Sequence, residues 1–271
     1  MPCTDRLRGC RVLVTRPTHQ SAGLAQAIEA LGGKALLLPT LEIRPTDPET
    51  VAAQLEVPGE IDYLIFISPN AVQWGVPILR RAGRLPPPRR IAAVGKATAK
   101  ALEAAGCPAA IVPESGADSE ALLAHPALRG VAGKEVLIVR GEGGRELLAE
   151  TLRARGATVA YAEVYRRVVP EAGGDRLARW LADGEIDIVT ATSAAGLENL
   201  LQMVPPERAD QLRALPLVVV SDRMLQLASA TGFTGPVEVA EGAGDLAVTE
   251  AACRLWESHP HPHPDRAKAR Q

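Results

Sequence analysis

The sequence is poor in aromatic residues, with three tryptophans, three tyrosines and two phenylalanines among 271 residues. Proteins that bind single-stranded nucleic acid need several aromatic side chains on which bases can stack. The formal net charge of −2 also provides no general positive field to attract nucleic acid or an acidic membrane surface. We therefore expect neither nucleic acid nor a membrane as a partner.

Cysteines and long apolar runs are also scarce. The four cysteines, Cys3, Cys10, Cys107 and Cys253, show neither the spacing of metal ligands nor the density of a disulfide scaffold. No apolar run approaches the roughly 18 residues of a membrane-spanning helix, and Met1–Arg11 lacks the apolar core of a signal peptide. We expect a cytoplasmic protein with reduced thiols and without a metal site.

Familiar catalytic motifs are missing as well. The chain has no G-x-S-x-G elbow, no Walker loop, no H-E-x-x-H and no Cys–His pairing. Only His19 and His125 lie outside the segment 259–271, which opens with alternating histidine and proline. We predict that this segment is a disordered tail, with a metal site in it as the minor alternative. A reaction run by this chain would depend on holding and shaping a ligand, with at most one proton donor.

The sequence contains a long internal repeat, in which residues 12–125 return as residues 136–250. Val12–Arg16, for example, corresponds to Val136–Arg140. The period exceeds the roughly 20–50 residues of a solenoid repeat and matches the size of a small domain. The repeat predicts two similar domains with a cleft between them, where ligands usually bind.

Strand and helix patterns alternate through both halves. Tyr63–Ile67 is a continuous apolar run, as in a buried parallel strand, and Ser21–Leu31 has apolar residues at helical spacing. We also predict a strand at Ala109–Val112. This alternation indicates α/β domains with doubly wound parallel sheets of the flavodoxin type, whose ligands bind beyond the carboxyl ends of the strands. Two stretches, Pro39–Pro48 and Tyr161–Pro170, are extended and charged, and we interpret each as a linker that continues the second strand of its repeat.

The clearest candidate for an anion-binding site is a glycine loop, Arg140–Arg145, which lies between a predicted strand and a predicted helix. Arg140 is its first residue, and Gly141, Gly143 and Gly144 lie within it. Glycines allow backbone N–H groups to converge on an anion, and the start of a helix adds favourable partial charge. The loop therefore predicts binding of an anionic group such as a carboxylate or a phosphate.

Two alternatives for the glycine loop remain open. One is dinucleotide binding, because Glu163 follows Gly141 at about the distance of the usual ribose-binding carboxylate, roughly 20 residues. Against it, Glu146 stands where the third glycine of G-x-G-x-x-G belongs. The other alternative is a plain turn between strand and helix. The repeat partner of the loop, Thr15–Gln20, contains no glycine.

Polar residues also follow other predicted strands, at the starts of helices. Ser68 and Asn70 lie at the start of one helix, and Ser193 and Ala194 lie at the start of the corresponding helix of the other repeat. These residues are either simple helix caps or groups that present hydroxyl, amide and N–H donors to a ligand. A third such turn supplies further candidates: Gly95, Lys96 and Thr98.

Together these pieces resemble uroporphyrinogen-III synthases over all but the ends of the chain. The resemblance rests on the order and spacing of five motifs: Val12–Pro17, Asp62–Val72, Ala93–Thr98, Val136–Arg145 and Ala162–Arg167. It implies two interwoven domains, one formed by residues 1–38 and 170–258 and the other by residues 41–166. The two extended stretches would then be the crossings. A single cut near residue 130 is the alternative.

The resemblance also implies an enzyme without a cofactor. Such an enzyme closes the linear tetrapyrrole hydroxymethylbilane into uroporphyrinogen III, with loss of water and inversion of the last pyrrole ring. Tyr165 matches the proton donor to the departing hydroxyl, and a phenol with a pKa near 10 can donate at neutral pH. The alternative for Tyr165 is a linker aromatic that faces the cleft. The sequence departs from the family pattern at Ser221–Met224, where a glycine-and-threonine turn is expected.

We therefore predict a monomeric synthase whose partner is a small tetrapyrrole with acetate and propionate groups. The alternatives are a two-domain protein that closes on an anionic ligand without catalysis, and a nucleotide-dependent enzyme. The predicted substrate contacts are Thr15, Arg16, Ser68, Asn70, Gly95, Lys96, Thr98, Arg140, Gly141, Gly143, Gly144, Ser193 and Ala194.

Overall fold

The chain folds into two compact units, as seen in a computed structural model that describes residues 5–55, 60–87 and 90–258. Unit 1 takes the described residues of Met1–Glu42 and Val168–Gln271, and unit 2 is Ile43–Arg167. Residue 130, near which the alternative cut was placed, lies inside unit 2. The histidine-rich segment 259–271 lies outside the described residues.

Unit 1 is built on a parallel sheet whose strand order is β10-β9-β8-β1-β2. Its strands are β1 (Arg11–Val14), β2 (Lys34–Leu37), β8 (Ile188–Thr190), β9 (Leu217–Val219) and β10 (Val237–Val239). Val12 pairs with Ala35 of β2 on one side and with Ile188 of β8 on the other. The strands β1, β8 and β9 are almost wholly buried, as expected for a parallel sheet covered on both faces.

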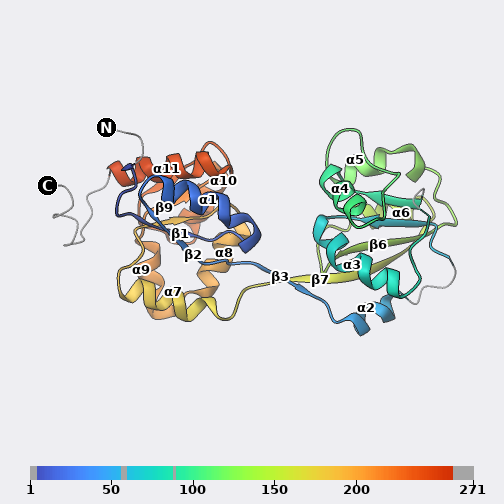
Figure 1. The fold of residues 1–271 in the computed structure, drawn as a ribbon, viewed down its shortest axis with the longest axis horizontal. Coiled ribbons are helices and arrows are strands. Elements are labelled where there is room, and N and C mark those ends of the chain that lie inside the picture. Colours follow the sequence, from blue (N-terminus) through green and yellow to red (C-terminus); the bar gives the residue numbers. More distant parts are fainter. Residues whose placement is uncertain (1–4, 56–59, 88–89, 259–271) are drawn as a thin grey trace. The chain divides into compact units, whose positions relative to one another are not determined.

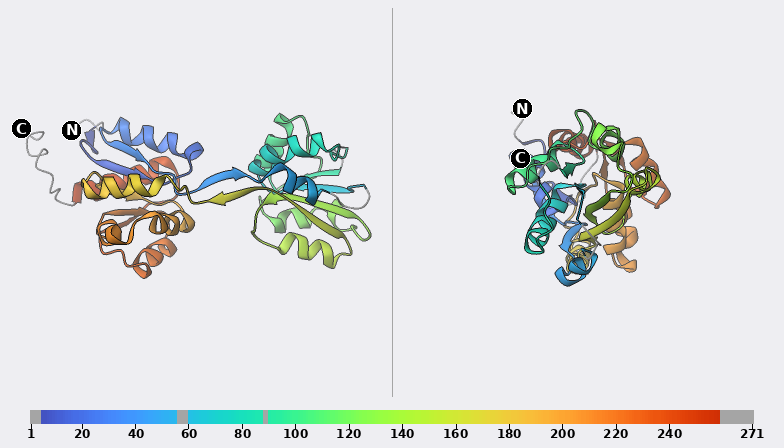
Figure 2. Two further views of the ribbon diagram at one scale, coloured as in Figure 1. Left: turned by 90° about the horizontal axis from the view of Figure 1, so that it is seen from below. Right: turned by 90° about the vertical axis from the view of Figure 1, so that its right-hand side faces the viewer.

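Helices cover both faces of this sheet (Figures 1 and 2). They are α1 (Thr18–Ala30), α7 (Gly173–Ala182), α8 (Ala194–Met203), α9 (Ala209–Arg213), α10 (Asp222–Ala230) and α11 (Asp245–Ser258). Leu24 of α1 and Val248 of α11 pack with Val12 and Val14 on one face. On the opposite face, Leu13 packs in a second core with the buried sides of α7, α8, α9 and α10. Successive side chains of β1 therefore pack into two separate cores, because they point to opposite faces of the sheet.

Unit 2 has a sheet of strand order β3-β7-β6-β4-β5. Its strands are β3 (Glu42–Pro45), β4 (Tyr63–Phe66), β5 (Ile91–Ala93), β6 (Glu135–Gly141) and β7 (Thr158–Val168). The strand predicted at Ala109–Val112 is reduced to a single bridge between Ala92 and Ile111. The prediction was wrong in extent because Pro108 and Pro113 flank the segment, and proline has no N–H to continue a ladder.

The helices of unit 2 also lie on both faces of their sheet (Figure 2). They are α2 (Pro48–Gln54), α3 (Pro69–Arg81), α4 (Lys96–Ala104), α5 (Ser119–Ala124) and α6 (Leu147–Ala154). A Cβ on Gly75 would lie 2.6 Å from Val139 Cγ1, so the absence of a side chain lets α3 sit directly on β6. In the described ranges, no helix combines the length and apolar character that crossing a membrane requires.

The two sheets place repeated segments in equivalent positions, which confirms two similar doubly wound domains. The strands β8, β1 and β2 follow one another in unit 1 as β4, β6 and β7 do in unit 2. The repeat partners β1 and β6 therefore each occupy an interior position, flanked by strands on both sides. The order of segments along the chain differs, since β1 opens unit 1 whereas β6 comes late in unit 2.

The two stretches interpreted as linkers belong to the sheet of unit 2. Pro39–Pro48 contains β3, and Tyr161–Pro170 continues β7 as far as Val168. These strands are neighbours, and Thr46 N donates to Val164 O over 3.1 Å. Both stretches are extended, as predicted, and Tyr161–Pro170 does continue a strand, β7. The chain passes from one unit to the other within them, at residues 42–43 and 167–168. The pairing of β3 with β7 was not predicted.

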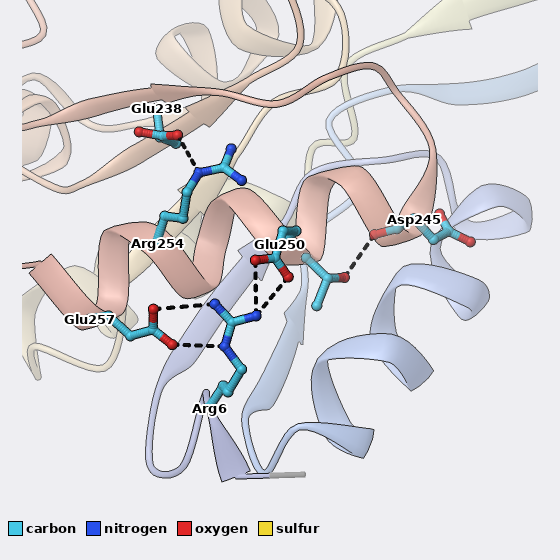
Figure 3. A network of polar contacts seen from close by, with 7 residues as sticks. Arg6, Glu238, Asp245, Glu250, Arg254 and Glu257 are labelled. Atoms are coloured by element: carbon cyan, nitrogen blue, oxygen red, sulfur yellow. Dashed lines mark hydrogen bonds and ion pairs between the residues drawn. The ribbon is translucent and has the colours of Figure 1, made fainter. Parts of the chain in front are cut away.

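A cluster of charges ties the first residues of unit 1 to its last helix (Figure 3). Arg6 donates from Nη1 to Glu250 Oε2 and from Nε to Glu257 Oε1, both over 2.7 Å. Arg254 of the same helix donates to Glu238 Oε1, also over 2.7 Å. The bonds from Arg6 hold the pKa of Glu257 below its ordinary value. This cluster links segments that are far apart in the sequence.

We expect Arg6→Ala to lower the free energy of unfolding by about 1 kcal/mol, the upper range for exposed ion pairs. The matched control is Arg8→Ala, whose ion pair with Asp5 is exposed and 3.8 Å long, and which should change stability little. Because the folded-state pKa of Glu257 is lowered, its contribution is present above its unfolded pKa and is lost as the pH falls through the folded value. Urea unfolding at several pH values measures this, and equal effects of the two variants would contradict the prediction.

Candidate functional site

A cavity of about 370 Å³ opens in unit 2, beyond the carboxyl ends of β4, β5 and β6. Its wall includes Arg140 and Gly141 at the end of β6, together with Gly143 and Gly144, which follow this strand. Ala117, Asp118 and Ser119 contribute from the start of α5. Every residue in the wall belongs to unit 2. The cavity lies where a doubly wound sheet usually binds its ligand.

Arg140 closes the glycine loop onto itself. Its side chain is only 3% exposed. Nε donates to Gly141 O over 3.2 Å, Nη1 donates to Glu146 Oε1 over 2.8 Å, and Nη2 donates to Gly143 O. The guanidinium also lies 4.7 Å from the ring centroid of Tyr161, a distance at which cation and ring attract. The internal bonds indicate that Arg140 holds the loop and has little surface left for a ligand.

Glu146 and Tyr161 complete this arrangement. The hydroxyl of Tyr161 donates to Glu146 Oε2, while Arg140 donates to Oε1 of the same carboxylate. These two donors hold the pKa of Glu146 below its ordinary value, with Tyr161 as the larger cause. The pKa of Tyr161 is raised, first because partial burial disfavours the phenolate and then because Glu146 accepts its hydrogen bond. The carboxylate therefore stays ionised and the phenol stays protonated around neutral pH.

The glycines of the loop are required by its backbone. Gly143 has a φ of +69° and Gly144 a φ of +108°, values that other residues rarely adopt. A Cβ on Gly144 would also lie 2.9 Å from Arg140 Nη2. Glu163 Oε1 accepts from Gly143 N over 3.3 Å. In the dinucleotide alternative, the carboxylate of Glu163 would bind a ribose. In the structure it binds the backbone of the glycine loop instead.

Tyr165 is turned into the core by a β-bulge. Residues at alternate positions of a strand share a face, so Tyr165 should lie on the same side as Tyr161. However, β6 and β7 shift register between Arg140 and Gly141: Arg140 pairs with Glu163 and Gly141 with Tyr165. One extra residue on β7 reverses the alternation. The Tyr165 side chain is fully buried, which contradicts the alternative of a linker aromatic that faces a cleft.

The buried ring of Tyr165 still reaches the wall of the cavity. Its hydroxyl lies 3.1 Å from Ser68 Oγ, which also accepts from Ala71 N as the cap of α3. Its ring packs so closely on Gly141 that a Cβ there would lie 2.4 Å from Tyr165 Cε2. Arg167 lies over the ring, 5.7 Å from its centroid. Tyr165 thus joins the core, the glycine loop and the helix start of Ser68.

The other predicted contacts of unit 2 lie near the cavity but outside its wall. Asn70 is partly exposed in the first turn of α3. Gly95 and Thr98 are buried at the start of α4, and Lys96 is exposed there. A Cβ on Gly95 would lie 2.8 Å from that of Ala117, so Gly95 lets two turns meet. These residues shape the edge of the sheet more than the cavity itself.

The predicted contacts of unit 1 gather at the carboxyl ends of β1 and β8. Thr15 is buried, and its hydroxyl donates to Thr190 O over 2.7 Å. Ser193 caps α8 by accepting from Gly196 N over 3.0 Å, and Ala194 is the first residue of that helix. The helix-cap interpretation therefore holds for Ser193 and for Ser68, whatever further role they have.

Arg16, predicted as a substrate contact, is bound within unit 1. Its side chain is 8% exposed, pairs with Asp245 Oδ1 at the start of α11 and donates from Nη2 to Ala243 O over 2.6 Å. It therefore holds the turn that precedes α11. The sequence carried a signal for this turn, because Gly242 and Gly244 directly precede a helical pattern.

Some charged groups at the cavity were not among the predicted substrate contacts, although one of them, Arg145, ends the predicted anion-binding loop. Arg145, with a side chain 79% exposed, and the exposed Arg167 both belong to the wall. Asp118 also lies there and caps α5 by accepting from Ala121 N over 2.8 Å. Within residues 5–55, 60–87 and 90–258, no group of His, Cys, Asp or Glu is arranged to hold a metal ion. The accessible cations make the cavity suited to an anionic group.

We expect Gly141→Ala to destabilise the protein by about 1–3 kcal/mol, the usual cost of overpacking a core. The new methyl group would collide with the ring of Tyr165, which is fully buried. Gly130→Ala is the control, since a Cβ there meets nothing within 4 Å. Thermal and urea unfolding compare the two variants, and similar stability would contradict the close contact.

We expect Tyr161 to ionise above the ordinary value of 10.0, and its pKa to fall in Glu146→Gln. The variant removes the carboxylate that raises this pKa, while partial burial remains. A raised folded-state pKa means that the stabilisation is present below pH ~10 and is lost as the pH rises through the folded value. NMR titration of ζ-¹³C-labelled tyrosine, with Tyr161→Phe to assign the signal, measures the shift. An unchanged pKa in the glutamine variant would show that Glu146 does not bind the phenol.

Comparison of the sequence with family models gives one match, described as uroporphyrinogen-III synthase HemD, over residues 22–242. The chain is 36% identical over 247 residues to uroporphyrinogen-III synthase of Escherichia coli, covering 89% of this chain and 98% of that protein. It is 34% identical over 211 residues to a putative uroporphyrinogen-III synthase of Methanothermobacter thermautotrophicus, covering 77% and 83% of the two chains.

Solved structures of similar fold carry the same description. A mutant uroporphyrinogen III synthase of Thermus thermophilus matches with a TM-score of 0.57 at 21% identity, over 92% of this chain and 100% of that one. Uroporphyrinogen-III synthetase of Helicobacter pylori matches with a TM-score of 0.53 at 17% identity, over 91% and 99% of the two chains. At these identities the likeness concerns the fold, and it agrees with two parallel α/β sheets.

Proposed function

This chain belongs to the uroporphyrinogen-III synthase family, and we propose that it closes hydroxymethylbilane into uroporphyrinogen III. In this reaction the terminal hydroxymethyl group loses its hydroxyl as water, and the carbon so activated bonds to the last pyrrole ring, which is inverted in the product. The electron-rich pyrrole assists departure of the hydroxyl. We therefore propose a lyase that needs no cofactor and acts mainly by positioning its substrate.

The observation that best supports this proposal is the cavity beside the glycine loop, with two accessible arginines in its wall. The substrate carries acetate and propionate groups, and arginine binds carboxylates with paired hydrogen bonds. A volume of about 370 Å³ is at the low end of ligand pockets, which span roughly 300–1,000 Å³. We infer that the cavity takes one pyrrole ring with its acidic side chains, and that the rest of the tetrapyrrole lies outside it.

We propose different roles for the arginines of the two units. Arg145 and Arg167 are exposed in the wall of the cavity and bind substrate carboxylates directly. Arg140, which is more than nine-tenths buried, holds the glycine loop at the cavity, and the equally buried Arg16 holds the turn before α11 in unit 1. The further proposed contacts follow the sequence prediction: Thr15, Ser68, Asn70, Gly95, Lys96, Thr98, Gly141, Gly143, Gly144, Ser193 and Ala194.

We propose that Tyr165 donates the proton to the departing hydroxyl with the help of Ser68. The phenol is buried, but its hydroxyl lies 3.1 Å from the hydroxyl of Ser68, which is partly exposed. A proton can pass along such a pair without exposure of the ring. The same bond keeps the phenol in one orientation, which is useful for a donor in a positioning enzyme.

We expect Tyr165→Phe to lower kcat more than it raises KM, because the ring remains and only the donor is lost. General acid catalysis contributes about 10²–10⁴-fold, and we expect a loss at or below the low end because Ser68 or water can donate instead. Steady-state kinetics measure the two constants, and circular dichroism checks the fold. An unchanged kcat would remove Tyr165 from the mechanism.

The proposed reaction is tested with purified protein and freshly prepared hydroxymethylbilane. Uroporphyrinogen III should form, whereas the substrate alone closes to isomer I. Separation of the oxidised porphyrins by chromatography gives the ratio of the two isomers. Formation of isomer I alone would exclude the synthase and favour a binding protein. We also propose that the enzyme acts as a monomer in the cytoplasm, and sedimentation velocity tests the first of these statements.

A further inference from the structure

We propose that Glu146 is a positioning residue that holds the glycine loop in its binding conformation through Arg140 and Tyr161. The inference rests on the proposed function, because it names a residue that serves substrate binding. Arg140 and Tyr161 both belong to the wall of the cavity, whereas Glu146 does not. One carboxylate joins these two groups, since Oε1 accepts from Arg140 and Oε2 accepts from Tyr161. Glu146 therefore acts on the cavity through two residues of its wall.

The place of Glu146 in the chain explains how it can act on the loop. It is the residue immediately before α6, whose Leu148 and Leu152 are buried in the core of unit 2. Its partners stand on β6 and β7, so the carboxylate connects three elements. Arg140 in turn donates to the carbonyl oxygens of Gly141 and Gly143. The rigid helix, the two strands and the loop are thus joined by one set of bonds.

The loop needs such support because of its composition. Gly143 and Gly144 both have positive φ and line the cavity, and glycine loses more conformational freedom on ordering than any other residue. A loop left mobile in the free enzyme must be ordered when the substrate binds, and this cost weakens binding. Loss of the support should therefore raise KM, whereas kcat should change little because no reacting group is removed.

A competing role for Glu146 predicts the opposite result. Its carboxylate could occupy the place of a substrate carboxylate on Arg140, in which case its removal would strengthen binding. The burial of Arg140, at 3% exposure, and its further bonds to the loop argue for support instead. The accessible cations of the wall remain free of this carboxylate: Arg145 is 79% exposed and Arg167 lies over the ring of Tyr165.

The test compares Glu146→Ala, Glu146→Gln and the control Glu150→Ala in the full chain with hydroxymethylbilane. Glu150 is exposed one turn further along α6. We expect Glu146→Ala to raise KM about tenfold, the effect of ordering one or two residues, with kcat within twofold of wild type. Glu146→Gln should restore most of the affinity, because its side-chain oxygen still accepts from Arg140. Glu150→Ala should leave both constants unchanged.

Amide hydrogen exchange gives a second readout that does not require the proposed reaction. In Glu146→Ala, residues 142–145 should exchange about tenfold faster, whereas the strands of unit 2 should keep their protection. If the wild-type protein were inactive, the proposed function would be refuted, but hydrogen exchange would still test whether Glu146 holds the loop. An unchanged or lower KM in an active Glu146→Ala enzyme, or unchanged exchange of the loop, would overturn the inference. Uniformly faster exchange throughout unit 2 would also overturn it, since Glu146 would then be a general structural residue.

Discussion

The pairing of β1 with β8 is the constraint on which unit 1 depends, because it joins two segments that are far apart in the chain. Val12, Leu13 and Val14 pair in register with Ile188, Val189 and Thr190. Side chains reinforce the ladder at both ends. Arg11 N donates to Asp187 Oδ2 over 2.7 Å, and the hydroxyls of Thr15 and Thr190 donate to backbone oxygens across the pair. Without β1, the sheet would lose an interior strand and both cores would lose a wall.

The site in unit 2 depends on a smaller feature, the bulge opposite Arg140 and Gly141. It directs the Tyr165 ring into the core, while Tyr161 stays on the other face beside Arg140. The two tyrosines of one strand thereby contact the glycine loop from opposite sides. One packs on Gly141, and the other binds the carboxylate at the end of the loop. Both therefore restrict the loop, although neither lies within it.

The sequence predicted the fold well where local patterns are strong. Continuous apolar runs identified β4 and β6, and the internal repeat predicted two similar domains. It failed where structure depends on distant partners. The segment of β3 was predicted to be an extended linker, but its pairing with β7 could not be predicted because that partner lies far along the chain. The helix α7 escaped notice because it opens with Gly173 and Gly174, which disfavour a helix in isolation.

For the candidate site, residue types at strand ends led to the right edge of the sheet and to the glycine loop. The sequence could not reveal which charged side chains are already bound to other parts of the protein. Arg140 and Arg16 look like free cations, yet each is buried and bonded to a turn. Whether Tyr165 faces solvent depended on a one-residue shift of register, which no periodicity in the sequence reveals.

The division of the chain between the units also has a consequence for the order of events during synthesis. A ribosome adds about 5–20 residues per second, so β1 emerges on the order of ten seconds before β8 exists to pair with it. Unit 2, which is one continuous segment, is complete in the meantime. Val12, Leu13 and Val14 are fully buried in the folded protein. Until β8 is synthesised, the edge of β1 that pairs with it stays uncovered. The nascent chain therefore presents an aggregation-prone strand for longer than its final structure suggests, and it is at this stage that a chaperone would have most to protect.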